Sequence, residues 1–533
     1  MNLYRLCRYK INISKEVLYP MKRKLLTLVL ALLLAISLIP ASVFADEPVT
    51  LKVLLVMHEL TKDPSEIDLY RQIEEMANVK FEFTVVRSGW SEKKATMLAS
   101  GDLPDMILST GISDTDIAQN TEYFVPLNDY LDQMPNLTRV FEEAPELKAA
   151  STQLDGNIYS VPSQSFFGGE SRGCTVINKE WLDKLGLEVP TTLEELKNVL
   201  IAFRDQDPNG NGIQDEIPMD MYGIDYASHY NILKHLGSWG MPSYNNQIFI
   251  TDDGEIVMSY TTEQYKELVE YAADLWSENL INKESFTQDY TMFQANAQNP
   301  EIPLVGVTNG YSIANRVGTQ WASQYVVCGP FALGDGTTPY YLTANNVGVN
   351  KGSIFTNCKD IEAAVRVLDA CYDEKISVQM MLGSIGDTMT YEDGHYTMTT
   401  PTDGSDADRW KWINSIADNG PFYISRETQS RIDLLPDYLD RLEQSDFYNP
   451  YFRDSKVALY PAMAKMTADD ANELALLNAD IYNYVSNRFA TWVTTGGVDE
   501  EWNDYLAQLD AMQIDRVREI YQNTYDNYMA NAE

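Results

Sequence analysis

The first part of the chain alternates between apolar extended runs and amphipathic stretches. Residues 49–57 (VTLKVLLVM) and 79–87 (VKFEFTVVR) have the apolar or alternating pattern of buried strands. Residues 64–78 and 91–100 have a helical pattern, and a short apolar run follows at 106–108. This order predicts a doubly wound parallel sheet in which the loop after the third strand faces a ligand crevice.

Short strands and longer helices are predicted over the rest of the chain. An Asp-Gly-Asn turn lies between strand-like runs in 154–162, and the strand-like 173–178 leads into a helix over 179–186. Thr191 or Thr192 offers an N-cap for a helix that runs to about Arg204. Further helical patterns cover 262–279, 360–371, most of 469–491 and 499–530, and strands are expected near 302–307 and 346–350.

These patterns predict two lobes connected by several crossings of the chain. We expect lobe 1 to contain 46–160 and about 300–355, because the strands near 302–307 and 346–350 suggest a return to the first sheet. Lobe 2 is expected to contain 161–299 and about 356–533, and to be rich in helices. Several crossings would form a hinge rather than a simple linker.

The N-terminal region has the pattern of a secretory signal peptide. Basic residues 22–24 precede an apolar run over 25–39, and small residues lead to an expected cleavage after Ala45. The apolar run is shorter than the ~20 residues that span a bilayer. We interpret 1–20 as a misassigned N-terminal extension and expect an exported protein, although no cysteine near the cleavage site could accept a lipid anchor.

Charge and cysteine content narrow the possible partners. A net charge of −38 argues against nucleic acid and anionic membranes as partners. The exported chain contains Cys174, Cys328, Cys358 and Cys371, which lack metal-ligand spacing. A bridge between Cys358 and Cys371 and a set of buried thiols are both compatible with the sequence.

Four segments carry a resemblance to a known family. They are 99–107 (ASGDLPDMI), 156–162 (GNIYSVP), 177–192 (INKEWLDKLGLEVPTT) and 207–218 (DPNGNGIQDEIP). With this order and spacing, the chain resembles the family 1 extracellular solute-binding proteins of carbohydrate ABC importers, including alginate-oligosaccharide and complex-sugar binders. The match is dense over roughly 45–225 and diffuse beyond.

The resemblance implies an α/β, two-lobe fold like that of periplasmic binding proteins, of the type II kind, with a large helical second lobe. It also implies an oligosaccharide ligand held between the lobes, transfer to the transmembrane subunits of an ABC permease, and no enzymatic activity. We expect the binding protein to be a monomer.

Residues 205–216 have the composition of a calcium loop. In one register Asp205 begins an EF-hand pattern that Glu216 closes. We favour a second register, which the resembling sugar binders use. Its ligands are Asp207, Asn209, Asn211, the carbonyl of Ile213, Asp215 and Glu216. Hard oxygen ligands along a glycine-containing loop suit Ca²⁺, and the expected role is structural. An Asx-rich turn without metal is the alternative.

Sugar binding calls for aromatic platforms and a few polar groups. Aromatic residues that lie beside glycines or at strand ends are the first candidates, and they are Phe166, Phe167, Trp239 and Tyr311. Weaker aromatic candidates are Trp321, Trp410 and Trp412, and possible polar contacts come from 111–114, Asn309 and Arg409.

Two other functions stay open at this point. A secreted glycoside hydrolase would use a pair of carboxyl groups, and 78 acidic residues do not single out such a pair. The chain has no G-x-S-x-G, H-E-x-x-H, P-loop, G-x-G-x-x-G or C-x-x-C motif. A peptide-binding or sensor-associated receptor of the same fold is the other alternative.

Overall fold

The computed structural model describes residues 47–532 apart from 168, 170, 172, 224–229, 242–247, 342–345, 403–404, 453–459 and 462. The expected signal peptide lies outside the described residues. Contacts separate residues 1–49 from the unit 50–533, which contains the architecture below. Within the described residues, no helix is long and apolar enough to cross a membrane.

The first sheet contains six strands and confirms the β-α-β opening. Its strand order is β14 (Phe422–Tyr423), β4 (Val161–Gln164), β11 (Val347–Ile354), β3 (Met106–Ile107), β1 (Val49–Val56) and β2 (Val79–Val86). β1 and β3 are parallel, with Val53 opposite Met106, whereas β11 runs antiparallel to β3 and β4. The sheet is therefore mixed rather than purely parallel.

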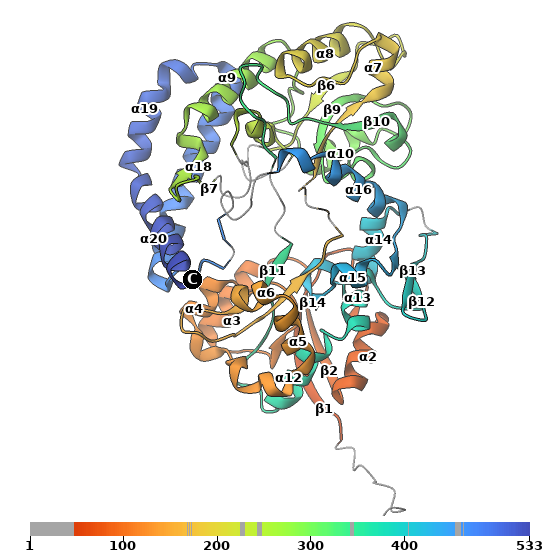
Figure 1. The fold of residues 1–533 in the computed structure, drawn as a ribbon, viewed down its shortest axis with the longest axis vertical. Coiled ribbons are helices and arrows are strands. Elements are labelled where there is room, and N and C mark those ends of the chain that lie inside the picture. The colour runs from red at the N-terminus through yellow and green to blue at the C-terminus, as the bar shows by residue number, and fades with distance from the viewer. Residues whose placement is uncertain are drawn as a thin grey trace, which may run out of the picture. The chain divides into compact units, whose positions relative to one another are not determined.

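Several helices lie between or after the strands of this sheet in the sequence and pack near it. They are α2 (Asp68–Ala77), α3 (Trp90–Ser100), α4 (Asp114–Gln119), α5 (Pro135–Glu143), α6 (Pro145–Ser151), α12 (Ile361–Ala370), α13 (Glu374–Leu382), α14 (Ala407–Asn414) and α15 (Arg426–Gln429). α12 packs against α2, and α13 packs against β14 (Figure 1). Segments after residue 356 therefore also pack beside the first sheet.

The second sheet contains four strands in the order β10 (Tyr325–Cys328), β5 (Cys174–Asn178), β9 (Val305–Gly310) and β6 (Ile217–Asp220). Its helices are α7 (Lys179–Leu185), α8 (Leu193–Asp205), α10 (Tyr290–Ala297) and α11 (Ile313–Val317). Thr192 caps α8 and forms a reciprocal capping box with Glu195, as the sequence predicts. Figure 1 shows this sheet with α7 and α8 apart from the first sheet.

One predicted strand forms, but it belongs to a different sheet from the one expected. The strand near 302–307 was expected in the first sheet, but β9 pairs with β5 and β6 of the second. β11 does join the first sheet, so the segment 300–355 is divided between the two sheets. The pattern locates a buried strand but contains no signal for its neighbour. The lobe boundaries as such stay a prediction.

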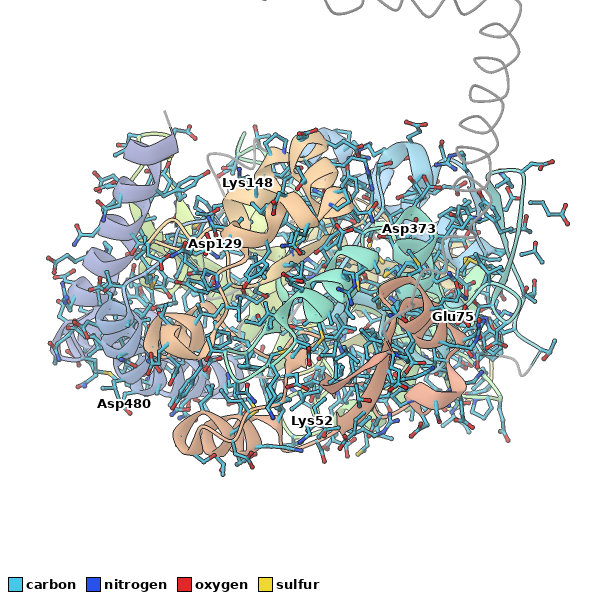
Figure 2. All side chains as sticks on the ribbon, turned by 90° about the horizontal axis from the view of Figure 1, so that it is seen from below. Lys52, Glu75, Asp129, Lys148, Asp373 and Asp480 are labelled. Atoms are coloured by element: carbon cyan, nitrogen blue, oxygen red, sulfur yellow. The ribbon has the colours of Figure 1, made fainter. Side chains whose placement is uncertain are left out.

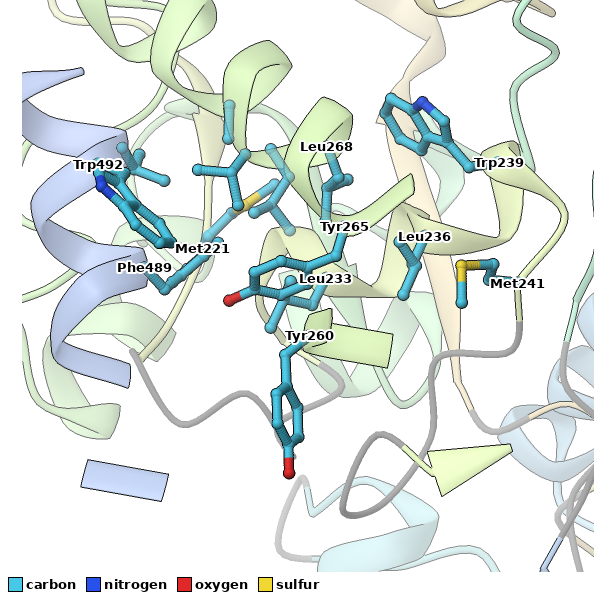
Figure 3. Close-up of a cluster of buried hydrophobic side chains, with 14 of the residues drawn as sticks. Met221, Leu233, Leu236, Trp239, Met241, Tyr260, Tyr265, Leu268, Phe489 and Trp492 are labelled. Carbon is cyan, nitrogen blue, oxygen red and sulfur yellow. The ribbon is translucent and has the colours of Figure 1, made fainter. Parts of the chain in front are cut away.

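Long helices complete the second lobe. α18 (Ala468–Thr495) and α19 (Val498–Ala511) lie beside α9 (Glu263–Ser277), and α20 (Ile514–Ala532) packs on α18 (Figure 1). Their apolar faces enclose a large core that includes Trp239, Tyr265, Phe489 and Trp492 (Figure 3). The predicted helix over 499–530 is two helices, divided at Met512 and Gln513.

Smaller elements follow no strong sequence pattern. They are α16 (Pro436–Phe447), the hairpin β7 (Ile248–Ile250) and β8 (Ile256–Met258), and the small sheet of β12 (Met389–Glu392), β13 (His395–Met398) and β15 (Ile432–Asp433). Short 3-10 helices are Pro64–Glu66, Leu127–Gln133, Thr121–Tyr123, Ile232–Trp239, Ser259–Thr261, Ala322–Gln324, Ala417–Asn419 and Asn449–Tyr451.

Charge is concentrated outside these cores. Exposed acidic side chains include Glu75, Asp129 and Asp480, which Figure 2 labels. The four cysteines of the described part, including Cys358 and Cys371, are buried free thiols. The buried-thiol alternative is thus the one that the structure contains.

Candidate functional site

A polar pocket lies where the first sheet meets segments of the second lobe. Its volume is about 330 Å³, and β4, β11 and β14 contribute Ser163, Val347, Gly348, Lys351 and Phe422. Tyr311, which follows β9 of the second sheet, and Arg441 on α16 line it too. The two sheets therefore supply side chains to one cavity, as expected for a ligand held between lobes.

Two predicted aromatic residues lie at this pocket. Phe167 lines it with a ring that is almost fully buried and lies 6.1 Å from the ring of Tyr438. Tyr311 also lines it, and the Arg441 guanidinium lies 4.1 Å from the centre of its ring. The structure brings these two residues together, while their contact with a ligand stays a prediction.

Charged side chains form the other wall of the pocket. Lys411 on α14 lies 3.1 Å from Asp408 and 3.4 Å from Asp418, and its side chain is only 2% exposed. Both carboxylates raise the pKa of Lys411 despite its burial, which by itself would lower that pKa. The same lysine and Arg441 hold the pKa of Asp408 below its usual value, although burial acts to raise it. The Lys411 ammonium and the Asp408 carboxylate thus stay charged at neutral pH.

Phe166 lies at a neighbouring pocket. The Arg426 guanidinium stacks 4.1 Å from its ring centre, and both residues line a cavity of about 320 Å³. Gly169 and Asn346 line this cavity and the first one. Phe166 therefore lies beside the main pocket, with one face of its ring covered by arginine.

Other residues that the sequence predicts as ligand contacts instead pack or form hydrogen bonds inside the protein. Trp239 is 7% exposed, belongs to the core of the second lobe and contacts Tyr271, so its indole offers no open face to a sugar. Asn309 is fully buried. Its Oδ1 accepts a hydrogen bond from the Thr175 hydroxyl, and its Nδ2 donates one to the carbonyl of Asn231. Trp321 donates to the carbonyl of Asn299 and packs on a small core.

The three candidates on α14 are also placed away from the pocket lining. The Trp412 ring stacks on His58 at 5.1 Å, and its carbonyl accepts a hydrogen bond from Thr61. Trp410 is half-buried, and its Nε1 has no hydrogen-bond partner among the described residues. Arg409 is exposed. This helix docks on the loop after β1, and its pocket residue is Lys411.

Sequence reasoning missed the basic residues of the pocket. Lys351, Lys411 and Arg441 are isolated in sequence and lie on a strand and two helices. A single basic residue on a polar helix is ordinarily a solvated one, so periodicity alone cannot distinguish these three. The burial of 411 and 441 arises only when distant segments meet.

The predicted calcium loop forms a tight turn around Asp207. The Asp207 carboxylate accepts backbone N–H groups of Gly210, Asn211 and Gly212 at 3.0–3.2 Å. Asp215 accepts the side-chain amides of Asn209 and Asn211 at 2.9–3.1 Å. Gly210 and Gly212 have positive φ angles of 79° and 77°, which this winding requires.

Glu216 closes the loop with an unused oxygen. Its Oε1 accepts from the N–H of Asn209 at 3.4 Å, and its Oε2 is buried with no partner among the described residues. Burial raises the pKa of Glu216, and the nearby charges of Asp207 and Asp215 raise it further. Neighbouring carboxylates and a buried oxygen without a partner among the described residues suit a hard cation. Over the described chain, however, no three His, Cys, Asp or Glu side chains have metal-binding geometry, so amide and carbonyl oxygens would have to complete the set.

Comparisons with known proteins agree with this architecture. The model of the family described as bacterial extracellular solute-binding protein matches residues 65–376. The fructooligosaccharide ABC transporter substrate-binding protein FusA of Streptococcus pneumoniae is 30% identical over 91% of this chain and 92% of its own. The polygalacturonan/rhamnogalacturonan-binding protein YtcQ of Bacillus subtilis is 27% identical over 46% of this chain and 48% of its own.

Solved structures resemble the chain over most of its length. An HMO-binding, ABC-transporter-associated solute-binding protein of Bifidobacterium longum infantis has a TM-score of 0.83 and 28% identity, covering 91% of this chain and 99% of its own. FusA in complex with kestose has a TM-score of 0.81 and 29% identity, covering 90% of this chain and 100% of its own. These neighbours share the two-lobe fold.

Proposed function

Since the chain belongs to the family of bacterial extracellular solute-binding proteins, we propose that it is the oligosaccharide-binding component of an ABC importer. It captures a glycan between its lobes, closes by a hinge motion and delivers the intact glycan to the transmembrane subunits of a permease. We further propose that it works as an exported monomer, which agrees with the signal-peptide pattern of residues 21–45.

The observation that carries the proposal is the composition of the pocket. The ring of Tyr311, beside the buried ring of Phe167, provides apolar surface for the C–H face of a sugar, while Ser163, Lys351 and Arg441 provide hydrogen-bond donors. Because strands of the first sheet and Tyr311, which follows β9 of the second, line one cavity, a ligand that contacts both favours the closed arrangement over the open one. A closed, ligand-filled form is a shape that a permease can recognise.

A calcium ion in the loop 207–216 is a second part of the proposal. Asp207, Asn209, Asn211, the carbonyl of Ile213, Asp215 and Glu216 would hold it, and the ion would neutralise carboxylates that otherwise repel one another. The buried, unpartnered Oε2 of Glu216 supports this assignment. The ion would fix the loop between α8 and β6, away from the pocket.

Removing the carboxylates of this loop tests the calcium proposal. The double variant Asp207→Ala/Asp215→Ala should have a lower melting temperature and should lose the response of that temperature to a chelator, because it cannot hold the ion. Differential scanning calorimetry with and without calcium measures both. A wild-type protein that melts identically with calcium and with chelator would contradict the assignment.

A thermal-shift screen tests the binding function. The exported form from Asp46 is mixed with fructooligosaccharides, other neutral and acidic oligosaccharides, monosaccharides and peptides, and each bound compound is recovered for mass spectrometry. We expect stabilisation by an oligosaccharide that is recovered intact, because a ligand of the folded state stabilises by mass action. Cleavage would favour a glycoside hydrolase, and stabilisation by peptides alone would overturn the glycan assignment.

A further inference from the structure

The pocket contains more basic than acidic groups among the described residues. Lys351, Lys411 and Arg441 line it together with one carboxylate, Asp418. Asp408 lies directly behind, within reach of Lys411 and Arg441. Three cations thus face two carboxylates in a chain whose 78 acidic residues outnumber 40 basic ones.

The two carboxylates are already engaged by one lysine. Lys411 lies between Asp408 and Asp418 and contacts both. In this trio one buried ammonium faces two carboxylates, of which Asp418 is half-exposed, so the three groups together carry one net negative charge. Lys411 is therefore a framework residue of the pocket, and with Arg441 and Lys351 the described groups keep one excess positive charge.

Arg441 has unused hydrogen-bond donors in a buried place. Its side chain is 6% exposed, and its contact with Asp408 is 3.7 Å long, beyond hydrogen-bond length. Its Nε has no hydrogen-bond partner among the described residues. The ring of Tyr311 covers one face of the guanidinium, which leaves the N–H edge to point elsewhere. A buried guanidinium that lines a cavity and whose Nε–H has no partner among the described residues is costly unless a ligand accepts that hydrogen bond.

Lys351 is the second of these cations, and it forms no ion pair with a carboxylate of the described residues. Its Nζ donates to the carbonyl of Asp418 at 2.6 Å, and it forms no ion pair within the described chain. Burial lowers its pKa, since little opposite charge offsets the loss of water. Gly348 makes room for it: a Cβ at that position would lie 2.6 Å from Cε of Lys351. The backbone is shaped to admit this ammonium beside the pocket.

We propose that the pocket binds a glycan unit that carries a carboxylate, with Arg441 and Lys351 as its partners. This inference rests on the proposed oligosaccharide-binding function and makes it more specific. The planar guanidinium can donate two parallel hydrogen bonds to a carboxylate, and the ammonium adds a point charge. An anionic unit would thus neutralise the excess charge that the protein leaves in place, whereas a neutral sugar would leave it buried.

Matched pairs of ligands test this proposal by titration calorimetry. The probes are trigalacturonate and 3′-sialyllactose, each paired with its own methyl ester, so that the members of a pair differ mainly in the charge of the carboxylate. We expect at least one acidic member to bind more than about tenfold tighter than its neutral partner, with affinity that falls as salt rises. Equal binding within both pairs, or binding of neutral oligosaccharides only, would overturn the inference and leave the proposed function intact. No binding of any glycan would overturn both.

Variants that remove one charge identify the responsible groups. Arg441→Gln and Lys351→Gln should each weaken binding of the acidic ligand by about tenfold or more, clearly more than that of the neutral partner, and reduce its salt dependence. Lys148→Gln on α6 is the matched control, because it removes the same charge from an exposed position. An equal loss of affinity in Lys148→Gln would show that the effect comes from the net charge of the protein, and it would overturn the assignment of Arg441 and Lys351. If Arg441→Gln fails to fold, Lys351→Gln decides alone.

Discussion

The type of a residue in this protein does not reveal whether it packs in a core or lines the pocket. Trp239 and Phe167 are both buried aromatics beside glycines, yet one belongs to the core and the other lines the pocket. The difference lies in which neighbours surround them. Burial alone therefore cannot assign a sugar platform.

Trp239→Ala should cost stability rather than specific binding. Loss of a buried indole leaves a cavity in the core of the second lobe, and we expect a decrease of about 3–5 kcal/mol in the free energy of unfolding. Urea denaturation followed by circular dichroism measures it. Ligand affinity, measured by calorimetry at a temperature where the variant is folded, should stay within a factor of about two to three. A large loss of affinity with native stability would return Trp239 to the binding site.

Elements of the second sheet are joined by a buried ion pair. Asp220 at the end of β6 contacts Arg316 on α11 at 2.9 Å, and both side chains are almost fully buried. Arg316 also donates to Thr308 on β9 and to the carbonyl of Phe293 on α10. Burial lowers the pKa of Arg316, while the charge of Asp220 raises it. One pair thus fixes two strands and two helices.

Asp220→Asn should destabilise this arrangement strongly. The substitution keeps the size of the side chain but leaves the guanidinium of Arg316 buried without its counter-charge, which costs about 3–5 kcal/mol. Asp515→Asn removes an exposed i,i+3 pair with Arg518 and serves as the control, with an expected change below about 1 kcal/mol. Both are read from urea denaturation midpoints. Equal effects of the two substitutions would refute the structural role of the pair.

Local patterns predict the elements better than their pairing. β1, α2, β2 and α8 follow from apolar periodicity and from the capping box at Thr192, because each signal is contained within a few turns of chain. β9 was assigned to the wrong sheet, since strand neighbours depend on contacts between distant segments. The pocket shows the same limit. Phe167 and Tyr311 have a local signal in adjacent glycines, whereas Lys351 and Arg441 acquire their role only through tertiary burial.

The lobes are also joined at a second place outside the pocket. Lys465, which precedes α18 and is 3% exposed, contacts Asp114 at the start of α4 at 2.8 Å. Asp114 also accepts from Gln153 and Asn350 beside the first sheet. Gln119 on α4 donates to Asn472 on α18. The helical second lobe is therefore tied to the first-sheet lobe by polar contacts that hinge opening would break.

Lys465→Met should weaken ligand binding without touching the ligand. Loss of the ion pair favours the open arrangement, so a larger part of the binding energy is spent on closure, and we expect affinity to fall several-fold. Titration calorimetry measures affinity, and small-angle scattering of the ligand-free variant should show a larger radius of gyration. Lys197→Met, which breaks a pair with Asp274 within one lobe, is the control. Unchanged affinity in Lys465→Met would show that the contact does not bias closure.

The most direct test of the binding account is the affinity of Tyr311→Ala for the oligosaccharide that stabilises the wild-type protein. Tyr311 follows β9 of the second sheet, lines the pocket together with strands of the first sheet, and lies against the Arg441 guanidinium. If the glycan binds there, calorimetric titration should show affinity reduced by about tenfold or more, with the melting temperature of the ligand-free variant near that of wild type. Wild-type affinity in a folded Tyr311→Ala protein would contradict this pocket as the binding site.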